Sequence, residues 1–154
     1  MSVPMWVFLV QGWIESMAIA AAGMATVGIR FEARALALVG IFQSFIAWVV
    51  RHLPIRFGMH TIVLQLILSG LIVLWVRARM MNAIAASFTG LALLGAGEVV
   101  LSLVVTRLLN TSLKVLADDV AGRLIYGSVV PPILYVYAAA LIRMRRGRDA
   151  QRGS

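Results

Sequence analysis

The sequence contains no cysteine and few charged residues. The absence of cysteine excludes disulfide bonds, thiolate metal ligands and cysteine nucleophiles. Charged residues make up 13% of the chain and hydrophobic residues 62%, whereas a soluble domain has roughly 25% charged and about 45–50% apolar residues. Such a chain has too little polar surface to cover a water-soluble globule, so we expect lipid to be its solvent.

Familiar catalytic motifs are missing as well. The chain has no HExxH, no GxSxG and no glycine-rich phosphate loop. His52 and His60 are separated by a turn containing Pro54, so they do not form a metal-binding pair on one helix face. We therefore expect no enzymatic activity, no metal site and no cofactor.

Long apolar runs dominate what is present. Five of them are long enough to cross about 30 Å of hydrocarbon as helices, and they cover residues 4–29, 33–50, 58–76, 81–105 and 120–142. The first run has no basic start and no cleavage site, which favours a span over a signal peptide. We predict an all-α polytopic membrane protein, with one domain of five transmembrane helices over 1–142 and a basic cytoplasmic tail over 143–154. The mixed connector 106–119 could form a short interfacial helix.

The distribution of basic residues predicts the orientation of the bundle. One side carries nine of them: Arg30, Arg34, Arg77, Arg79, Arg143, Arg145, Arg146, Arg148 and Arg152. The other side carries five: Arg51, Arg56, Arg107, Lys114 and Arg123. By the positive-inside rule the first side is cytoplasmic, so the N-terminus lies outside and the C-terminus inside a bacterial cytoplasmic membrane. Anionic lipid accounts for the basic tail, and no nucleic-acid partner is expected.

Glu15 is a carboxylate near the centre of the first apolar run. A charge at that depth costs roughly 2.5 kcal/mol or more. Gln11 lies one turn earlier on the same helix face, which continues through Ala18, Ala22 and Ala25. A polar pair above a stripe of small residues is expected to face protein. Glu15 is either part of a ligand or proton site, or a protonated side chain that only hydrogen-bonds to a neighbouring helix.

Glu98 is a second carboxylate, in the fourth run. Gly95 and Gly97 precede it and permit either close helix packing or a local break in the helix, and Ser102 lies one turn further on. If Glu98 faces Glu15, the two could share a proton, because neighbouring carboxylates in a low dielectric resist double ionisation. We expect both carboxylates to be buried in one polar intramembrane site.

His60 opens the third run, next to a polar stripe. Thr61, Gln65 and Ser69 follow at spacings of four residues, which places them on one helix face. The predicted orientation puts His60 at the outer mouth of the bundle. It is either a solvated residue at the helix end or a gate that responds to pH, because histidine titrates near neutrality.

Pro131 and Pro132 interrupt the fifth run. Each removes a backbone donor and disrupts a helix. In a membrane, the freed carbonyls must be satisfied by protein or water. The pair is therefore a candidate hinge, with a static kink as the alternative.

The segment LPIRFGMHT, residues 53–61, follows one span and opens the next. It resembles a pattern in the membrane-embedded N-terminal regions of bacterial sensor histidine kinases of the GHKL-ATPase type. Glu15 and Glu98 fit positions where such regions carry a carboxylate. The resemblance implies a sensory module. No phosphoacceptor helix or ATP-binding domain follows residue 142, so we expect a stand-alone relative or the membrane part of such a protein, without kinase activity.

Three functions remain open on these residues. The first is a sensory or ligand-binding module in which an unknown small ligand is bound by Gln11, Glu15, His60, Gln65 and Glu98. Its tail would signal to a partner membrane or signalling protein. The second is a proton- or cation-coupled transporter or channel subunit, for which a homodimer is expected. The third is an assembly protein that binds another membrane protein through its small-residue face.

Overall fold

The computed structural model describes residues 5–52, 59–109 and 120–152, and these residues form helices and two short turns, with no strand among them. The helices are α1 (Met5–Val27), α2 (Ala33–Arg51), α3 (Met59–Val76), α4 (Met80–Leu109) and α6 (Val120–Arg152). The protein is therefore an all-α membrane bundle, as predicted. By length and composition, α1, α2, α3 and the part of α4 from Met80 to Arg107 can each cross a membrane, which makes the chain a multi-pass membrane protein. The fifth predicted span is helical, and its crossing of the membrane stays a prediction.

The predicted spans agree with the helices most closely for α2 and α3, within one residue at each end. Two helices run further than their apolar segments: α4 continues to Leu109, and α6 continues through the basic residues to Arg152. Arginine and alanine are good helix formers whatever their hydropathy, so a helix need not end where the apolar run ends. Residues 53–58, and residues 110–119 of the connector predicted as an interfacial helix, lie outside the described residues.

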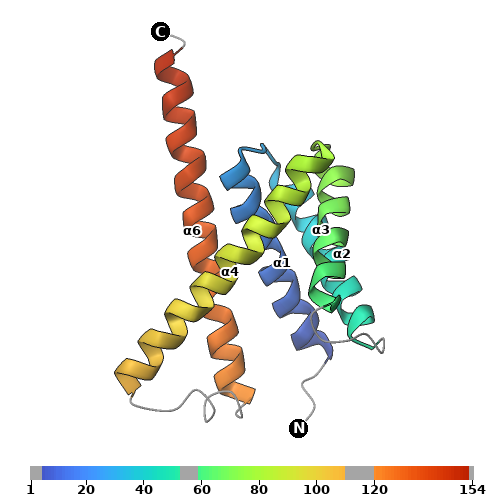
Figure 1. The fold of residues 1–154 in the computed structure, drawn as a ribbon, viewed down its shortest axis with the longest axis vertical. Helices are drawn as coiled ribbons and strands as arrows, with labels where there is room; N and C mark the ends of the chain where they lie inside the picture. The colour runs from blue at the N-terminus through green and yellow to red at the C-terminus, as the bar shows by residue number, and fades with distance from the viewer. Residues whose placement is uncertain (1–4, 53–58, 110–119, 153–154) are drawn as a thin grey trace.

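Successive helices run in opposite directions, and the two termini lie at opposite ends of the bundle (Figure 1). The α1–α2 turn, the α3–α4 turn and the C-terminal part of α6 share one end. The structure thus gathers Arg30, Arg34, Arg77 and Arg79 with the arginines of the C-terminal part of α6, from Arg143 onwards, at one end, as the count of basic residues predicts. That this end is cytoplasmic stays a prediction.

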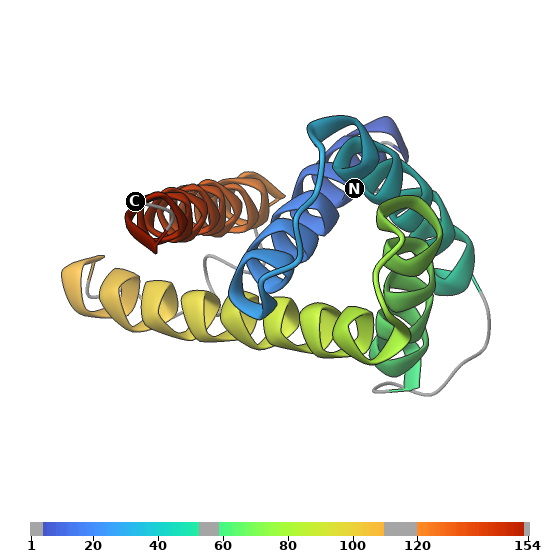
Figure 2. The same cartoon turned by 90° about the horizontal axis from the view of Figure 1, so that it is seen from above.

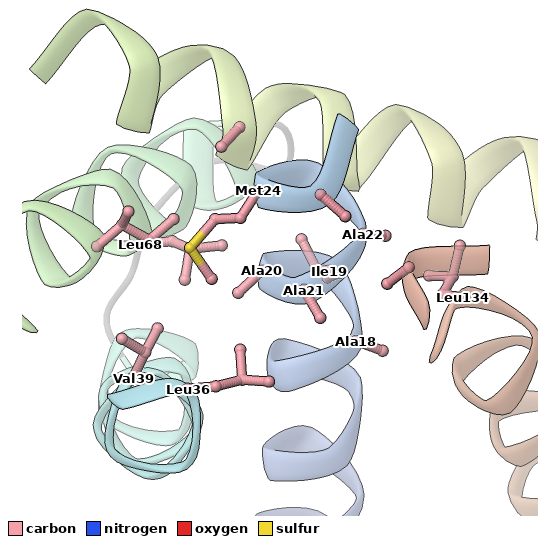
Figure 3. Close-up of a cluster of buried hydrophobic side chains, with 14 of the residues drawn as sticks. Ala18, Ile19, Ala20, Ala21, Ala22, Met24, Leu36, Val39, Leu68 and Leu134 are labelled. Atoms are coloured by element: carbon pink, nitrogen blue, oxygen red, sulfur yellow. The ribbon is translucent and has the colours of Figure 1, made fainter. Parts of the chain in front are cut away.

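Helix α1 is the centre of the bundle, because α2, α4 and α6 all pack against it (Figure 2). Ala18, Ala22 and Ala25 are buried, as predicted, and so is every other residue between Ala18 and Ala25, because neighbouring helices surround this part of α1. These small side chains let the neighbouring helices approach closely, which favours van der Waals packing between helices in lipid. In Figure 3, Met24 of α1 points towards Leu68 of α3 and fills the space that the alanines leave on that side.

Glycines set the crossing of α1 with α4. A Cβ atom on Gly23 would collide with the carbonyl oxygen of Ala86, and one on Gly90 would collide with the carbonyl oxygen of Ile19. The two backbones are therefore in direct contact at this crossing. Beyond it, the C-terminal half of α4 diverges from α2 and α3 (Figure 1).

Two turns end their helices with a residue in the left-handed region. Gly28 has φ 90°, and its amide and that of Ile29 both donate to the Met24 carbonyl at 2.9 Å. Arg77 has φ 57° and its amide donates to the Val73 carbonyl at 3.0 Å. Such a residue closes the last turn of a helix and is usually glycine, so Arg77 holds a conformation that strains an L-residue.

Candidate intramembrane polar site

Glu15 and Glu98 occupy the middle of α1 and the C-terminal half of α4. The sequence predicts two buried carboxylates, but Glu15 is only partly buried and Glu98 is exposed. The difference arises because α4 diverges from α2 and α3 after its crossing with α1, which leaves this part of the helix with few neighbours (Figure 1). The polar site therefore lies at the edge of the bundle.

The two carboxylates nevertheless lie within electrostatic range of one another. Glu15 interacts electrostatically with Glu98, from a helix far away in the sequence, and also with Arg51 at the end of α2. Arg51 is anchored beside α1 because its guanidinium lies 4.4 Å from the centroid of the Phe8 ring. The site thus combines two acidic side chains with one basic side chain, contributed by three helices.

The proline segment of α6 packs beside both glutamates. The Tyr135 hydroxyl donates to the carbonyl of Ile14, the residue before Glu15, at 3.1 Å. On α4, a Cβ atom on Gly97, the residue before Glu98, would lie 2.8 Å from a methyl carbon of Val130. Gly97 therefore permits the close approach of α6, as expected, whereas a Cβ atom on Gly95 would meet nothing within 4 Å.

Pro131 and Pro132 lie between these two contacts. Pro131 is buried and Pro132 exposed, and α6 continues through both residues. Each proline removes one backbone hydrogen bond from this part of the helix, so α6 is weakened at the level where it touches the glutamate-bearing segments. A hinge at this level stays a prediction.

A second polar group links α2 with α3. The Gln43 side-chain amide donates to the Leu64 carbonyl at 2.9 Å. Gln65, the next residue on α3, is only 4% exposed. The side-chain oxygens of both Gln43 and Gln65 are buried without a hydrogen-bond partner. Buried polar atoms are nearly always paired, so these two oxygens call for a donor such as water or a ligand.

The polar stripe on α3 continues from Gln65 towards α4. The Ser69 hydroxyl donates to the Gln65 carbonyl at 2.8 Å and lies 2.7 Å from the Ser87 hydroxyl of α4. Gln65 and Ser69 are buried, whereas Thr61 is exposed. Only the inner part of the predicted stripe therefore faces protein, where it links α3 to α4.

His60 and Gln11 lie in the N-terminal parts of α3 and α1. His60 is partly buried, and its Nε2 atom is buried without a hydrogen-bond partner. It therefore differs from a fully solvated residue at a helix end. Gln11 is also partly buried, one turn before Glu15 on α1. Of the five predicted binding residues, Glu15 and Glu98 are brought together, and Gln65 belongs to the group between α2, α3 and α4.

Sequence reasoning missed Gln43 and Ser44. Gln43 is an amide in the middle of the second apolar run, and a polar residue at that depth is itself a signal. The Ser44 hydroxyl donates to the Leu9 carbonyl at 2.7 Å, and it lies beside Gly12, which leaves room for it. A serine in a span carries a weaker signal, because it can bond to its own helix. Within the described part of the chain, no three acidic or histidine side chains gather as a metal site would require.

No protein-family model, curated protein or solved structure matches this chain. Its function must therefore be inferred from its own residues and packing.

Proposed function

We propose that the protein is a ligand-binding sensory module of the bacterial cytoplasmic membrane, whose ligand is a proton or a small cation bound at Glu15 and Glu98. The observation that carries the proposal is the electrostatic interaction of these two carboxylates between α1 and α4, beside the proline segment of α6. In this proposal the module is not an enzyme, and its output passes to a partner protein.

The chemistry of the pair favours positive ligands. Two carboxylates close together in a low dielectric repel one another, and a proton or cation relieves that repulsion. An ionisable residue inside a membrane span is costly, so its presence is a functional signal by default. Arg51 offsets part of the negative charge at Glu15.

The packing of α6 offers a route from the site to the basic end of the bundle. Tyr135 and Val130 contact the segments that carry the glutamates, and Pro131 and Pro132 lie between them. Binding that changes the spacing of α1 and α4 would therefore bend α6 at its weakest point. The resemblance of residues 53–61 to sensor-kinase membrane regions fits such a relay.

Transport of a proton or cation is the second candidate. The buried, unpartnered oxygens of Gln43 and Gln65 favour it, because they would give a cation or water further ligands inside the bundle. The two functions differ in one measurable respect: a sensory module binds without net flux, whereas a transporter moves its ligand through a sealed bilayer.

The test combines binding and flux on the purified chain. Infrared difference spectra recorded over a pH titration, in membranes of native-like lipid, report protonated carboxyl groups directly. We expect the carboxyl band to change with pH or on addition of sodium, potassium or ammonium, and to be lost in Glu15→Gln and Glu98→Gln. Glu32→Gln is the matched control, since Glu32 is an exposed carboxylate in the α1–α2 turn. Spectra that are the same in all three variants would refute the site.

Movement of α6 and flux are measured on the same preparation. The chain has no cysteine, so spin labels can be placed on Gly70→Cys and Gly147→Cys, where a side chain meets open space. We expect the label distance to change with ligand, and to stop changing in Glu15→Gln. Proteoliposomes with an internal pH dye are expected to show no flux. Flux that Glu15→Gln abolishes would favour the transporter over the sensory module.

A further inference from the structure

A basic cavity of about 750 Å³ lies at the arginine-rich end of the bundle, between the end of α1 and the C-terminal part of α6. Its lining includes Arg30, Arg145, Arg146 and Arg148, and among the described residues that line it none is acidic. Because like charges repel, four guanidinium groups around one cavity favour an anion within it. This cavity is separate from the glutamate pair and independent of the proposed function.

Arg145 is held in place by α1. Its Nη2 atom donates to the Thr26 carbonyl at 2.8 Å, and its guanidinium packs against Gly28, where a Cβ atom would collide with it. That bond occupies one N–H, and the planar guanidinium has further donors on its other edges. Arg146 and Arg148 line the same cavity and are exposed. One fixed and several adjustable guanidinium groups suit a phosphate group, which arginine binds through paired hydrogen bonds.

The rest of the lining is apolar. Ile29 and Phe31 follow α1, and Ile142 is the last apolar residue of α6 before its arginines. The cavity therefore spans the level at which the apolar runs end, which is where lipid headgroups lie. A soluble phosphate ion needs only the arginines, whereas a phospholipid also uses an apolar wall for its glycerol and upper acyl chain.

We propose that this cavity binds the phosphodiester headgroup of an anionic phospholipid from the surrounding leaflet. The arginines of α6 hold the phosphate, and the apolar residues of the α1–α2 turn and α6 contact the glycerol and upper acyl chain. The bound lipid joins the end of α1 to α6 and so ties α6 to the membrane surface.

The test is a lipid titration of the full chain in detergent, followed by native mass spectrometry. The probes are phosphatidylglycerol, phosphatidylcholine with the same acyl chains, and inorganic phosphate as competitor. The site variant is R146Q/R148Q, which leaves Arg145 and its bond to Thr26 in place. The control is R34Q/R79Q, which removes the same charge from exposed residues at the same end that do not line the cavity.

We expect the wild-type chain to bind phosphatidylglycerol at least about tenfold more tightly than phosphatidylcholine. R146Q/R148Q should weaken the binding of phosphatidylglycerol about 10- to 30-fold, and R34Q/R79Q less than about threefold, because each basic residue at the site contributes about a fivefold preference. Equal losses in the two variants would overturn the site and leave only general attraction to anionic lipid. Inorganic phosphate that binds as tightly as the lipid would overturn the assignment to a phospholipid.

Discussion

The hydroxyl of Tyr137 on α6 lies 3.2 Å from the hydroxyl of Thr26 on α1. The Thr26 hydroxyl also lies 2.7 Å from the Ala22 carbonyl of its own helix, and the Thr26 carbonyl accepts from Arg145. The last turn of α1 contains no basic residue. The Thr26 carbonyl, at the negative end of the helix dipole, therefore accepts a hydrogen bond from an arginine more than a hundred residues away in the sequence.

The first prediction concerns this capping contact. Arg145→Gln should lower the free energy of unfolding by about 1–2 kcal/mol, since a hydrogen bond to a charged donor at a helix C-terminus is lost. Tyr137→Phe should cost less, about 0.5–1 kcal/mol, in the range of neutral hydrogen bonds within membranes. Unfolding by SDS in mixed micelles measures both values.

The control for this contact is Arg143→Gln, which removes the same charge from an exposed residue two positions earlier on α6. We expect its unfolding midpoint to match that of the wild type. A loss in Arg143→Gln as large as that in Arg145→Gln would mean that the charge of the segment, and not the bond to Thr26, stabilises the bundle.

The second prediction tests the crossing of α1 with α4. Gly23→Ala and Gly90→Ala each place a methyl group against a backbone carbonyl of the facing helix, so each should cost about 1–3 kcal/mol by overpacking. Gly70→Ala is the control, because a Cβ atom there meets nothing within 4 Å, and its better helix propensity should stabilise the chain by up to about 1 kcal/mol. The three variants are compared by thermal unfolding in detergent. Equal unfolding midpoints for the three variants would show that α1 and α4 can move apart without loss of stability.

The third prediction is a double-mutant cycle on the glutamates. Glu15→Gln and Glu98→Gln should each stabilise the chain by about 1 kcal/mol, because each removes a costly intramembrane charge and its repulsion. The double variant should gain less than the sum of the single gains, by about 0.5 kcal/mol or more, since the repulsion can be removed only once. Unfolding at pH 8 gives the three values. The control is the double variant of Glu15→Gln with Glu32→Gln, for which we expect additive gains in stability. Additive gains for Glu15→Gln with Glu98→Gln would show that these two carboxylates do not interact.

The sequence predicts the helices of this bundle better than their contacts. The bounds of α2 and α3 follow from the length of their apolar runs, because a span must match the hydrocarbon thickness. The burial of Ala18, Ala22 and Ala25 follows from their small size, but their helical spacing does not predict that α1 is buried all round between Ala18 and Ala25. The end of α6 cannot be predicted in this way. An arginine-rich segment outside the lipid can either continue the helix or be non-helical, and hydropathy does not distinguish the two.

The site was only partly predictable for a related reason. Glu15 and Glu98 stand out as isolated carboxylates in apolar runs, but their burial depends on how far α4 diverges from its neighbours. That divergence follows from the angle at which Gly23 and Gly90 let two backbones cross, a tertiary property that neither span encodes alone. Gln43 carried a usable signal, whereas its partner carbonyl at Leu64 could be identified only from the packing of α2 on α3.

The last prediction concerns the strained turn between α3 and α4. Arg77 holds φ 57° where glycine would be unstrained, so Arg77→Gly should stabilise the chain by about 0.5–1 kcal/mol, even after the larger entropy of glycine in the unfolded chain is counted. Arg79→Gly is the matched variant: it removes the same charge from the same turn, but Arg79 is not among the residues with positive φ. We expect no gain from it in thermal unfolding. If both variants are stabilised equally, the cause is the removal of a charge from the crowded arginines at this end of the bundle, and not the backbone conformation of Arg77.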